Sequence, residues 1–146
     1  MAQLHSASDR SQVLDTMIGL TRLSPSQRAI IAGNGGMELY LGLRQRGFMR
    51  AATISTNWLP RKQHTIGLLA DRNSAAIERA LGELSPYLCT NATVAVLIDA
   101  HEHDTNLKVR AKLQQMGFQI EAGVRCHQGL VLSACRQGFS RMEKAA

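Results

Sequence analysis

Residues 29–40 read AIIAGNGGMELY, and this stretch decides the fold. Its first four residues are apolar and partly β-branched, which predicts a short buried strand. The glycines that follow predict a turn, and the residues from Met37 onward predict a helix. Glycine at such a junction adopts positive φ and lets a ligand approach the backbone, while the free N–H groups of the helix start face the same place. The stretch therefore predicts a strand, turn and helix that suit a nucleotide-like ligand.

The length and composition indicate one folded domain. The chain has 146 residues, enough to bury a single core without disulfides or metals. Hydrophobic residues make up 45% and charged residues 19%, as in ordinary globular proteins. We expect one domain over residues 1–146, with flexible ends at residues 1–7 and 137–146. Three cysteines without CxxC spacing, no signal-peptide core and no apolar run of about twenty residues predict a cytoplasmic protein without a membrane segment.

Apolar runs of strand and helix type alternate along the chain, which predicts an α/β fold. We expect a mostly parallel sheet with helices on both faces and a C-terminal antiparallel hairpin. The expected strands are residues 29–32, 48–55, 65–70, 93–99, 118–125 and 130–135. The expected helices are residues 8–23 with Ser8 and Asp9 as capping candidates, 37–46, the segment between the capping candidates at 71–74 and Pro86, and 107–116. Gly47 and Gly117 stand where a left-handed residue ends a helix.

The glycine turn after the first strand and the final hairpin resemble the class I S-adenosylmethionine-dependent methyltransferases. The second half matches best, because residues 75–88, 92–99, 113–118 and 131–136 follow the family's order of helix, strand, helix ending at Gly-Phe, and closing hairpin. The resemblance covers about residues 10–136. It implies a Rossmann-like sheet and S-adenosylmethionine as the cofactor.

The resemblance also implies a set of cofactor-binding residues. It makes the glycine turn the cofactor cradle, with two polar partners at the ends of later segments: Gly33, Asn34, Gly35, Gly36, Asn57 and Asp71. The alternative is that these glycines only let a helix pack tightly against a strand, since glycine turns recur in α/β folds without nucleotides. The sequence leaves both interpretations open.

The first half departs from the family pattern in three places. An acidic residue usually stands two positions before the first glycine, and this chain has Ile31 there. A second usually ends the next strand and holds the ribose, where residues 55–57 read STN. The chain before Thr65 is too short for the usual helix and third strand, so we expect a shortened sheet.

These departures define three functional hypotheses. The first, which the departures favour, is a degenerate or truncated methyltransferase-like domain whose S-adenosylmethionine site is eroded. Such a domain would bind a small molecule or a protein, or form a homodimer, without catalysis. The alternative is an active small S-adenosylmethionine-dependent methyltransferase with an unknown acceptor. The weakest is a nucleic-acid-binding protein, because the net charge of +6 is scattered over the chain.

Two further groups of residues carry chemistry that the sequence alone does not resolve. His101, His103, Cys126 and His127 would cluster if the final hairpin packs beside the strand that ends at Asp99, and could bind zinc or act as acid and base. Their spacing matches no zinc motif, so we expect no metal. In the loop at 56–64, the lone Trp58 and the basic Arg61, Lys62 and His64 could stack on a base and contact phosphate, or Trp58 could simply cover a core edge. Met17, Met37 and Met116 are expected in the core.

Overall fold

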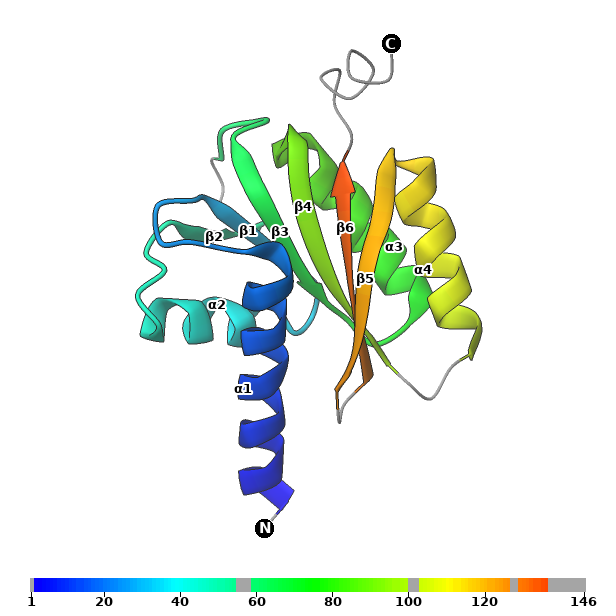
Figure 1. The fold of residues 1–146 in the computed structure, drawn as a ribbon. Helices are drawn as coiled ribbons and strands as arrows, with labels where there is room; N and C mark the ends of the chain where they lie inside the picture. The colour runs from blue at the N-terminus through cyan, green and yellow to red at the C-terminus, as the bar shows by residue number, and fades with distance from the viewer. Residues whose placement is uncertain (1, 55–58, 100–102, 127–128, 137–146) are drawn as a thin grey trace.

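A six-stranded sheet forms the centre of the protein (Figure 1). The computed structural model describes residues 2–54, 59–99, 103–126 and 129–136. In spatial order the strands are β2 (Ala51–Thr53), β1 (Ala29–Ala32), β3 (His64–Ala70), β4 (Leu88–Asp99), β6 (Gly129–Arg136) and β5 (Phe118–Cys126). The first four are parallel, and β6 pairs antiparallel with both β4 and β5. This confirms the predicted fold class.

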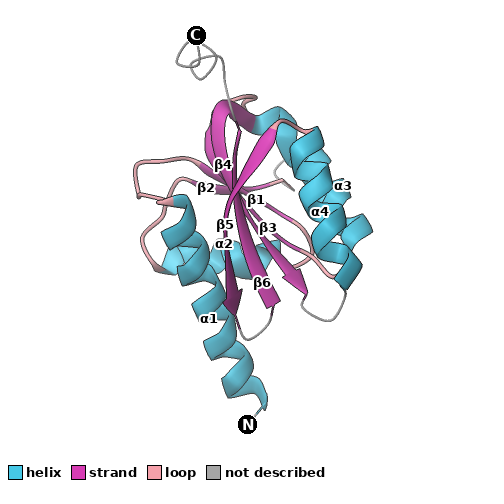
Figure 2. Ribbon diagram, turned by 45° about the vertical axis from the view of Figure 1, so that its right-hand side comes forward, coloured by secondary structure: helices cyan, strands magenta, loops and turns pink. Residues whose placement is uncertain are grey.

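Helices cover both faces of the sheet. They are α1 (Ala2–Thr21), α2 (Gly36–Gln45), α3 (Ser74–Leu84) and α4 (His103–Gln115), with a short 3-10 helix, η1 (Ser85–Tyr87). Figure 2 shows the sheet between the pair α1 and α2 and the pair α3 and α4. Alternation along β1 explains the layers, because Ile31 belongs to the apolar cluster under α1 and α2 whereas Ile30 belongs to the cluster under α3 and α4.

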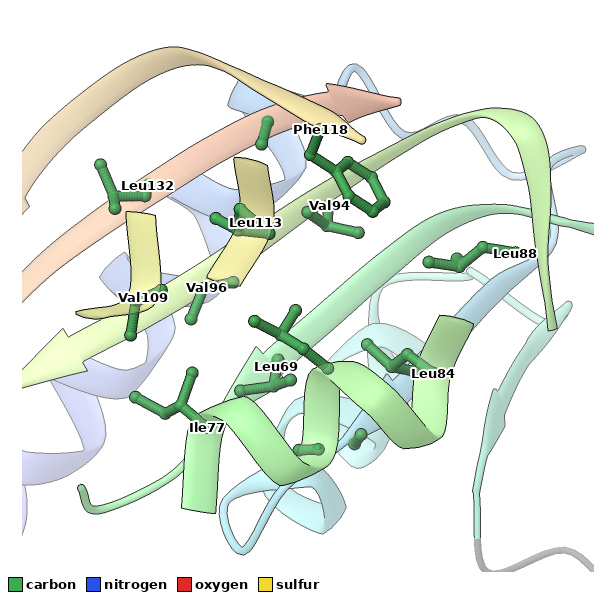
Figure 3. Close-up of a cluster of buried hydrophobic side chains, with 14 of the residues drawn as sticks. Leu69, Ile77, Leu84, Leu88, Val94, Val96, Val109, Leu113, Phe118 and Leu132 are labelled. Carbon is green, nitrogen blue, oxygen red and sulfur yellow. The ribbon is translucent and has the colours of Figure 1, made fainter. Parts of the chain in front are cut away.

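The cluster under α3 and α4 is the larger core (Figure 3). Ile77 and Leu84 of α3 and Leu113 of α4 are fully buried against the central strands, where Leu69 and Val96 contribute side chains. Truncating a buried leucine to alanine in such a core costs about 2–5 kcal/mol. This core fixes the strand ends on which the candidate site is built.

Element boundaries differ from the sequence prediction mainly at α1 and β2. Helix α1 begins at Ala2, so Ser8 and Asp9 lie inside it and the predicted cap was wrong. The second strand keeps only Ala51–Thr53 of the predicted residues 48–55, because Gly47 and the turn at 49–50 follow α2 directly. Among the described residues between β2 and β3, none is helix or strand, as the shortened connection predicted. None of the described helices has the length and hydropathy needed to span a membrane.

Candidate ligand-binding site

The glycine turn packs directly against the end of β3. Gly33 has φ +93°, and a Cβ there would overlap the carbonyl oxygen of Ala70. A Cβ on Gly35 would lie 3.1 Å from the Ala70 Cβ, and one on Gly36 would lie 3.3 Å from Cγ2 of Ile31. Close packing of the turn against β3 therefore requires glycine at Gly33. The same packing explains the glycines at Gly35 and Gly36, so no bound ligand is needed to account for them.

The backbone donors of the turn are used inside the protein. The N–H of Gly35 donates to the Ala70 carbonyl over 3.0 Å, and the N–H of Gly36 donates to the Gly33 carbonyl over 3.0 Å. The N–H of Asn34 donates to Oδ2 of Asp71 over 3.1 Å. In the first turn of α2 the N–H of Leu39 also bonds within the protein, donating to the Gly35 carbonyl over 3.4 Å. A ligand at this turn would therefore contact mainly side chains and carbonyl oxygens, because most of the backbone N–H groups already have acceptors.

Asp71 is the charged group fixed at the turn. It follows the last residue of β3, and its Oδ1 accepts from the N–H of Arg72 over 2.8 Å while its Oδ2 accepts from Asn34. Two backbone donors thus hold one carboxylate at the carboxyl edge of the parallel strands. Ligands in open parallel sheets bind at this edge.

Two cavities meet at the contact between Asp71 and Asn34, since both residues line both cavities. The helix pocket, of about 920 Å³, lies between α1 and α2 and the strand ends. Its lining includes Leu14, Gly35, Glu38, Leu39, Gly42, Arg46, Ala70, Arg72 and Leu97. The edge pocket, of about 460 Å³, lies between the glycine turn, the end of β2 and α3, and its lining includes Gly33, Gly36, Met37, Thr53, Ile54, Ala76, Arg79, Ala80 and Glu83. Both volumes fall in the range of small-molecule sites.

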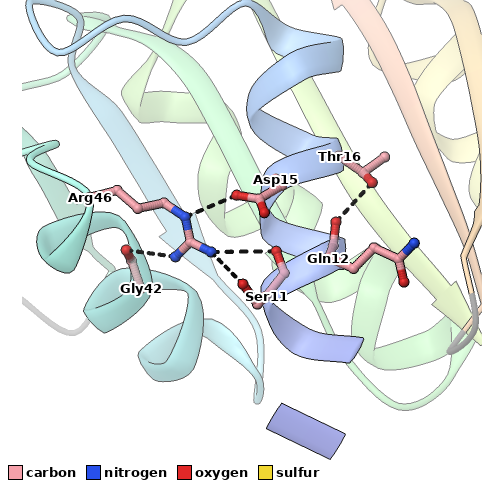
Figure 4. A network of polar contacts seen from close by, with 6 residues as sticks. All are labelled: Ser11, Gln12, Asp15, Thr16, Gly42 and Arg46. Atoms are coloured by element: carbon pink, nitrogen blue, oxygen red, sulfur yellow. Dashed lines mark hydrogen bonds and ion pairs between the residues drawn. The ribbon is translucent and has the colours of Figure 1, made fainter. Parts of the chain in front are cut away.

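A network around Arg46 joins the two helices that form the helix pocket (Figure 4). Its guanidinium donates to Oδ1 of Asp15 over 3.0 Å, to Oγ of Ser11 over 2.8 Å and to the Gly42 carbonyl over 3.0 Å. The helices approach closely here, because a Cβ on Gly42 would lie 2.5 Å from Cδ2 of Leu14. Arg46 and Gly42 thus set the spacing of the two helices.

Five of the six predicted cofactor-binding residues line these two pockets. Gly33 and Gly36 line the edge pocket, Gly35 lines the helix pocket, and Asn34 and Asp71 line both. Asn57 lies outside the described residues. The binding role of all six stays a prediction.

The structure adds carboxylates that the sequence analysis missed. Glu38 of α2 lines the helix pocket and Glu83 of α3 lines the edge pocket. Glu83 falls on one helical stripe with Ala76 and Ala80, so the spacing i, i+4, i+7 is the signal that could have grouped them. Met37, predicted to be a core residue, is 55% exposed beside the edge pocket, because the first turn of α2 points it away from the sheet. Met17 is fully buried as predicted.

The second predicted cluster is only partly described. The final hairpin packs beside β4, with Asp99 opposite Gly129 and Gly129 opposite Cys126. The Cys126 thiol lies 3.7 Å from Oγ1 of Thr16 on α1. His101 and His127 lie outside the described residues, and the structure describes only the backbone of His103. The described side chains contain no group of three metal ligands.

The basic loop before β3 contributes one residue to the interior. His64 is 3% exposed, and its Nδ1 lies 3.2 Å from the Tyr87 carbonyl oxygen. Burial lowers the pKa of His64 below its usual 6.5, the nearby Arg28 charge lowers it further, and the Tyr87 carbonyl opposes the shift. Arg61 and Lys62 are exposed, whereas Trp58 lies outside the described residues. His64 is therefore a structural residue and is not displayed for nucleic acid.

Solved methyltransferases share this fold along most of its length. A SAM dependent methyltransferase from Aquifex aeolicus matches with a TM-score of 0.56 and 11% identity over 88% of this chain and 98% of that one. Magnesium protoporphyrin IX methyltransferase from Synechocystis PCC 6803, solved with bound SAM, matches with a TM-score of 0.59 and 10% identity over 89% of this chain and 81% of that one. The 1,6-didemethyltoxoflavin-N1-methyltransferase from Burkholderia thailandensis, solved with S-adenosylhomocysteine, matches with a TM-score of 0.58 and 12% identity over 88% of this chain and 78% of that one.

The chain thus has the class I S-adenosylmethionine-dependent methyltransferase fold. No protein-family model matches its sequence, and no curated protein matches it significantly. At such low identities the likeness establishes the fold, and the function has to be argued from the site.

Proposed function

We propose that this protein binds S-adenosylmethionine across the edge pocket and the helix pocket and transfers its methyl group to a small acceptor. The observation that carries the proposal is the meeting of the two pockets at Asn34 and Asp71. A cofactor in the edge pocket would present its reactive end at this contact, and the larger helix pocket would hold the acceptor on the other side. Two adjoining cavities can hold the two reactants side by side, as a direct transfer between them requires.

The residues present fit such a cofactor. The cofactor carries an ammonium and a sulfonium group, and the carboxylate of Asp71 lies where both pockets meet. Met37 lines the edge pocket in the first turn of α2, and a helix start favours an acceptor or anionic group of a ligand. Ile54 and Ala80 give the edge pocket apolar walls for a base.

When bound, S-adenosylmethionine supplies an electrophilic methyl group on a sulfonium. The protein then has to hold the acceptor in line and exclude water. Leu14, Leu39 and Leu97 supply apolar surface in the helix pocket, which favours an acceptor with an apolar body. Glu38 and Asp71 line the same pocket and would take up the proton that the acceptor releases on methylation.

Isothermal titration with S-adenosylmethionine and S-adenosylhomocysteine tests the binding step. The proposal expects saturable heat with both ligands, and a weaker response in Asp71→Asn. Absence of heat at millimolar ligand in the wild-type protein would reject it. Formation of S-adenosylhomocysteine from S-adenosylmethionine in the presence of a pooled small-molecule extract tests the transfer step.

A non-catalytic ligand-binding module is the second candidate function. It is favoured because Ile31 replaces the expected carboxylate and because the turn donates its N–H groups internally. This candidate expects binding of the same ligands without production of S-adenosylhomocysteine over hours. Steady production that requires the extract would instead establish the enzyme.

A further inference from the structure

Basic side chains gather at the amino edge of the sheet, where the parallel strands begin. Strands β1, β2 and β3 are parallel, with Ala29 paired to both Ala51 and Ile66, so the residues before each strand meet at this edge. The loop that joins α1 to β1 comes to the same edge. We call these residues the basic edge: Arg22, Arg28, Arg50, Arg61 and Lys62. The candidate ligand site lies at the other end of the strands.

Hydrogen bonds between the loops fix two of these arginines. Nη1 of Arg28 donates to Oε1 of Gln63, which directly precedes β3, over 2.7 Å. Nη1 of Arg50, which directly precedes β2, donates to the Ser26 carbonyl over 2.8 Å. The Arg28 carbonyl in turn accepts from the N–H of Thr65 over 3.1 Å. The segments before three neighbouring strands are therefore tied together, and their charges are held close to one another.

The charge of the basic edge is not neutralised by the residues that the structure describes. Residues 16–37 and 39–70 contain no Asp or Glu. None of the five basic residues forms an ion pair with a described residue, and all except the half-buried Arg28 are exposed. Glu83, in the last turn of α3, lines the edge pocket. The basic edge therefore offers its charge to a partner that carries several negative groups.

The backbone at two of these positions would suit glycine better than a basic residue. Arg22 has φ +56° and Lys62 has φ +59°, and in the described part of the chain they are the non-glycine residues with positive φ. An L-residue in this region costs about 1–2 kcal/mol. Packing does not explain the long side chains, because both residues are exposed. Charged residues at such positions indicate that the charge itself has a use.

We propose that the basic edge binds the phosphodiester backbone of a nucleic acid. Four of its five residues are arginines, whose guanidinium groups form paired hydrogen bonds with phosphate oxygens. A surface that inserts into a membrane would also present several large apolar side chains, and of the described exposed ones only Met49 belongs to these loops. Phosphate contacts carry no sequence information, so the binding is independent of base sequence. It is also independent of the ligand proposed for the opposite edge.

Fluorescence anisotropy with labelled RNA and DNA of about 20 nucleotides, single- and double-stranded, tests the proposal. The wild-type protein should bind at about 50 mM salt. With three to five phosphate contacts on a duplex, the affinity should fall roughly 40- to 500-fold when the salt is raised to about 200 mM.

A pair of double variants locates the binding surface. Arg50→Gln/Arg61→Gln changes the basic edge, and Lys108→Gln/Arg125→Gln is the matched control, because it removes the same charge from exposed residues of α4 and β5. The first variant should weaken duplex binding roughly 100-fold at about 50 mM salt and reduce the slope of log affinity against log salt by about 1.8. The control should stay within about threefold of wild type. Circular dichroism and urea unfolding check that both variants fold.

The possible results decide the proposal in both directions. Binding to RNA, to DNA or to both supports it, and the relative affinities identify the partner. Absence of binding at about 50 mM salt, or equal losses in the two variants, would overturn it. Binding to phosphatidylserine vesicles or to heparin but to no nucleic acid would also overturn it and assign the basic edge to another polyanion.

Discussion

Replacing Gly33 by alanine tests whether the glycine turn is a packing device. Gly33 has φ +93°, and a Cβ there would clash with the Ala70 carbonyl oxygen. Gly47 offers a matched control, because it has φ +90° with nothing within 4 Å of its Cβ position. Alanine at either position pays the cost of a positive φ, but only alanine at Gly33 also clashes with a neighbouring atom.

The structure gives a magnitude for each variant. An L-residue at this φ costs about 1–2 kcal/mol, which is the whole effect expected for Gly47→Ala. In Gly33→Ala the overlap also forces the turn away from β3 and breaks the bonds from Gly35 to Ala70 and from Asn34 to Asp71. Each is worth about 0.5–1.5 kcal/mol, so the total loss is about 2–5 kcal/mol.

Urea unfolding followed by circular dichroism measures both losses, and thermal unfolding provides a second readout. At about 4 °C per kcal/mol for a chain of this length, Gly33→Ala should lower Tm by roughly 8–20 °C and Gly47→Ala by roughly 4–8 °C. Equal destabilisation of the two variants would refute the close approach of the turn to Ala70. The turn would then have room for a ligand at its backbone.

Three further predictions concern the helices and β3. Gly42→Ala should destabilise the protein by about 1–3 kcal/mol through overpacking against α1, whereas Gly82→Ala, with open space at its Cβ position, should stabilise it by about 0.5–1 kcal/mol in urea unfolding. A double-mutant cycle on Arg46 and Asp15 should give a coupling below about 1 kcal/mol, because Asp15 is 63% exposed, and a larger value would show a buried pair. The lowered pKa of His64 means that the unfolded chain takes up a proton more readily than the folded one as pH falls below 6.5. Stability should therefore decline below pH 6.5 in the wild type and less in His64→Gln, and parallel pH profiles would contradict this.

Local signals predicted much of the fold. Gly47 and Gly117 both have φ +90° immediately after helices, as the sequence indicated, because helix termination depends on residues within one turn. Asn73 caps α3 by accepting from the N–H of Ala76, which is equally local. The short apolar run at 29–32 became a fully buried strand.

Features that depend on tertiary packing could not be predicted. Beside the helix pocket, Arg46 bonds to Asp15 and Ser11 of α1. These residues precede it by 31 and 35 positions, and no local pattern relates them. His64 belonged to a basic loop in the sequence, but it begins β3 and faces the Tyr87 carbonyl from a later segment. The sequence places Glu83 on an amphipathic helix, but it does not show that this side of the helix lines a pocket with β2 and the glycine turn.

Ile31 links the packing of the turn to the placement of the binding groups. Its side chain is 1% exposed in the cluster under α1 and α2, and it lies against the position of Gly36. A carboxylate there would lose its hydration among apolar neighbours, so isoleucine stabilises the strand at the cost of an acceptor for a ligand. The carboxylates that line the edge pocket, Asp71 and Glu83, both come from the single segment that runs from the end of β3 through α3. If the site binds an adenosyl ligand, that segment provides the negatively charged side chains, and the glycine turn provides the close packing that holds the strand ends together.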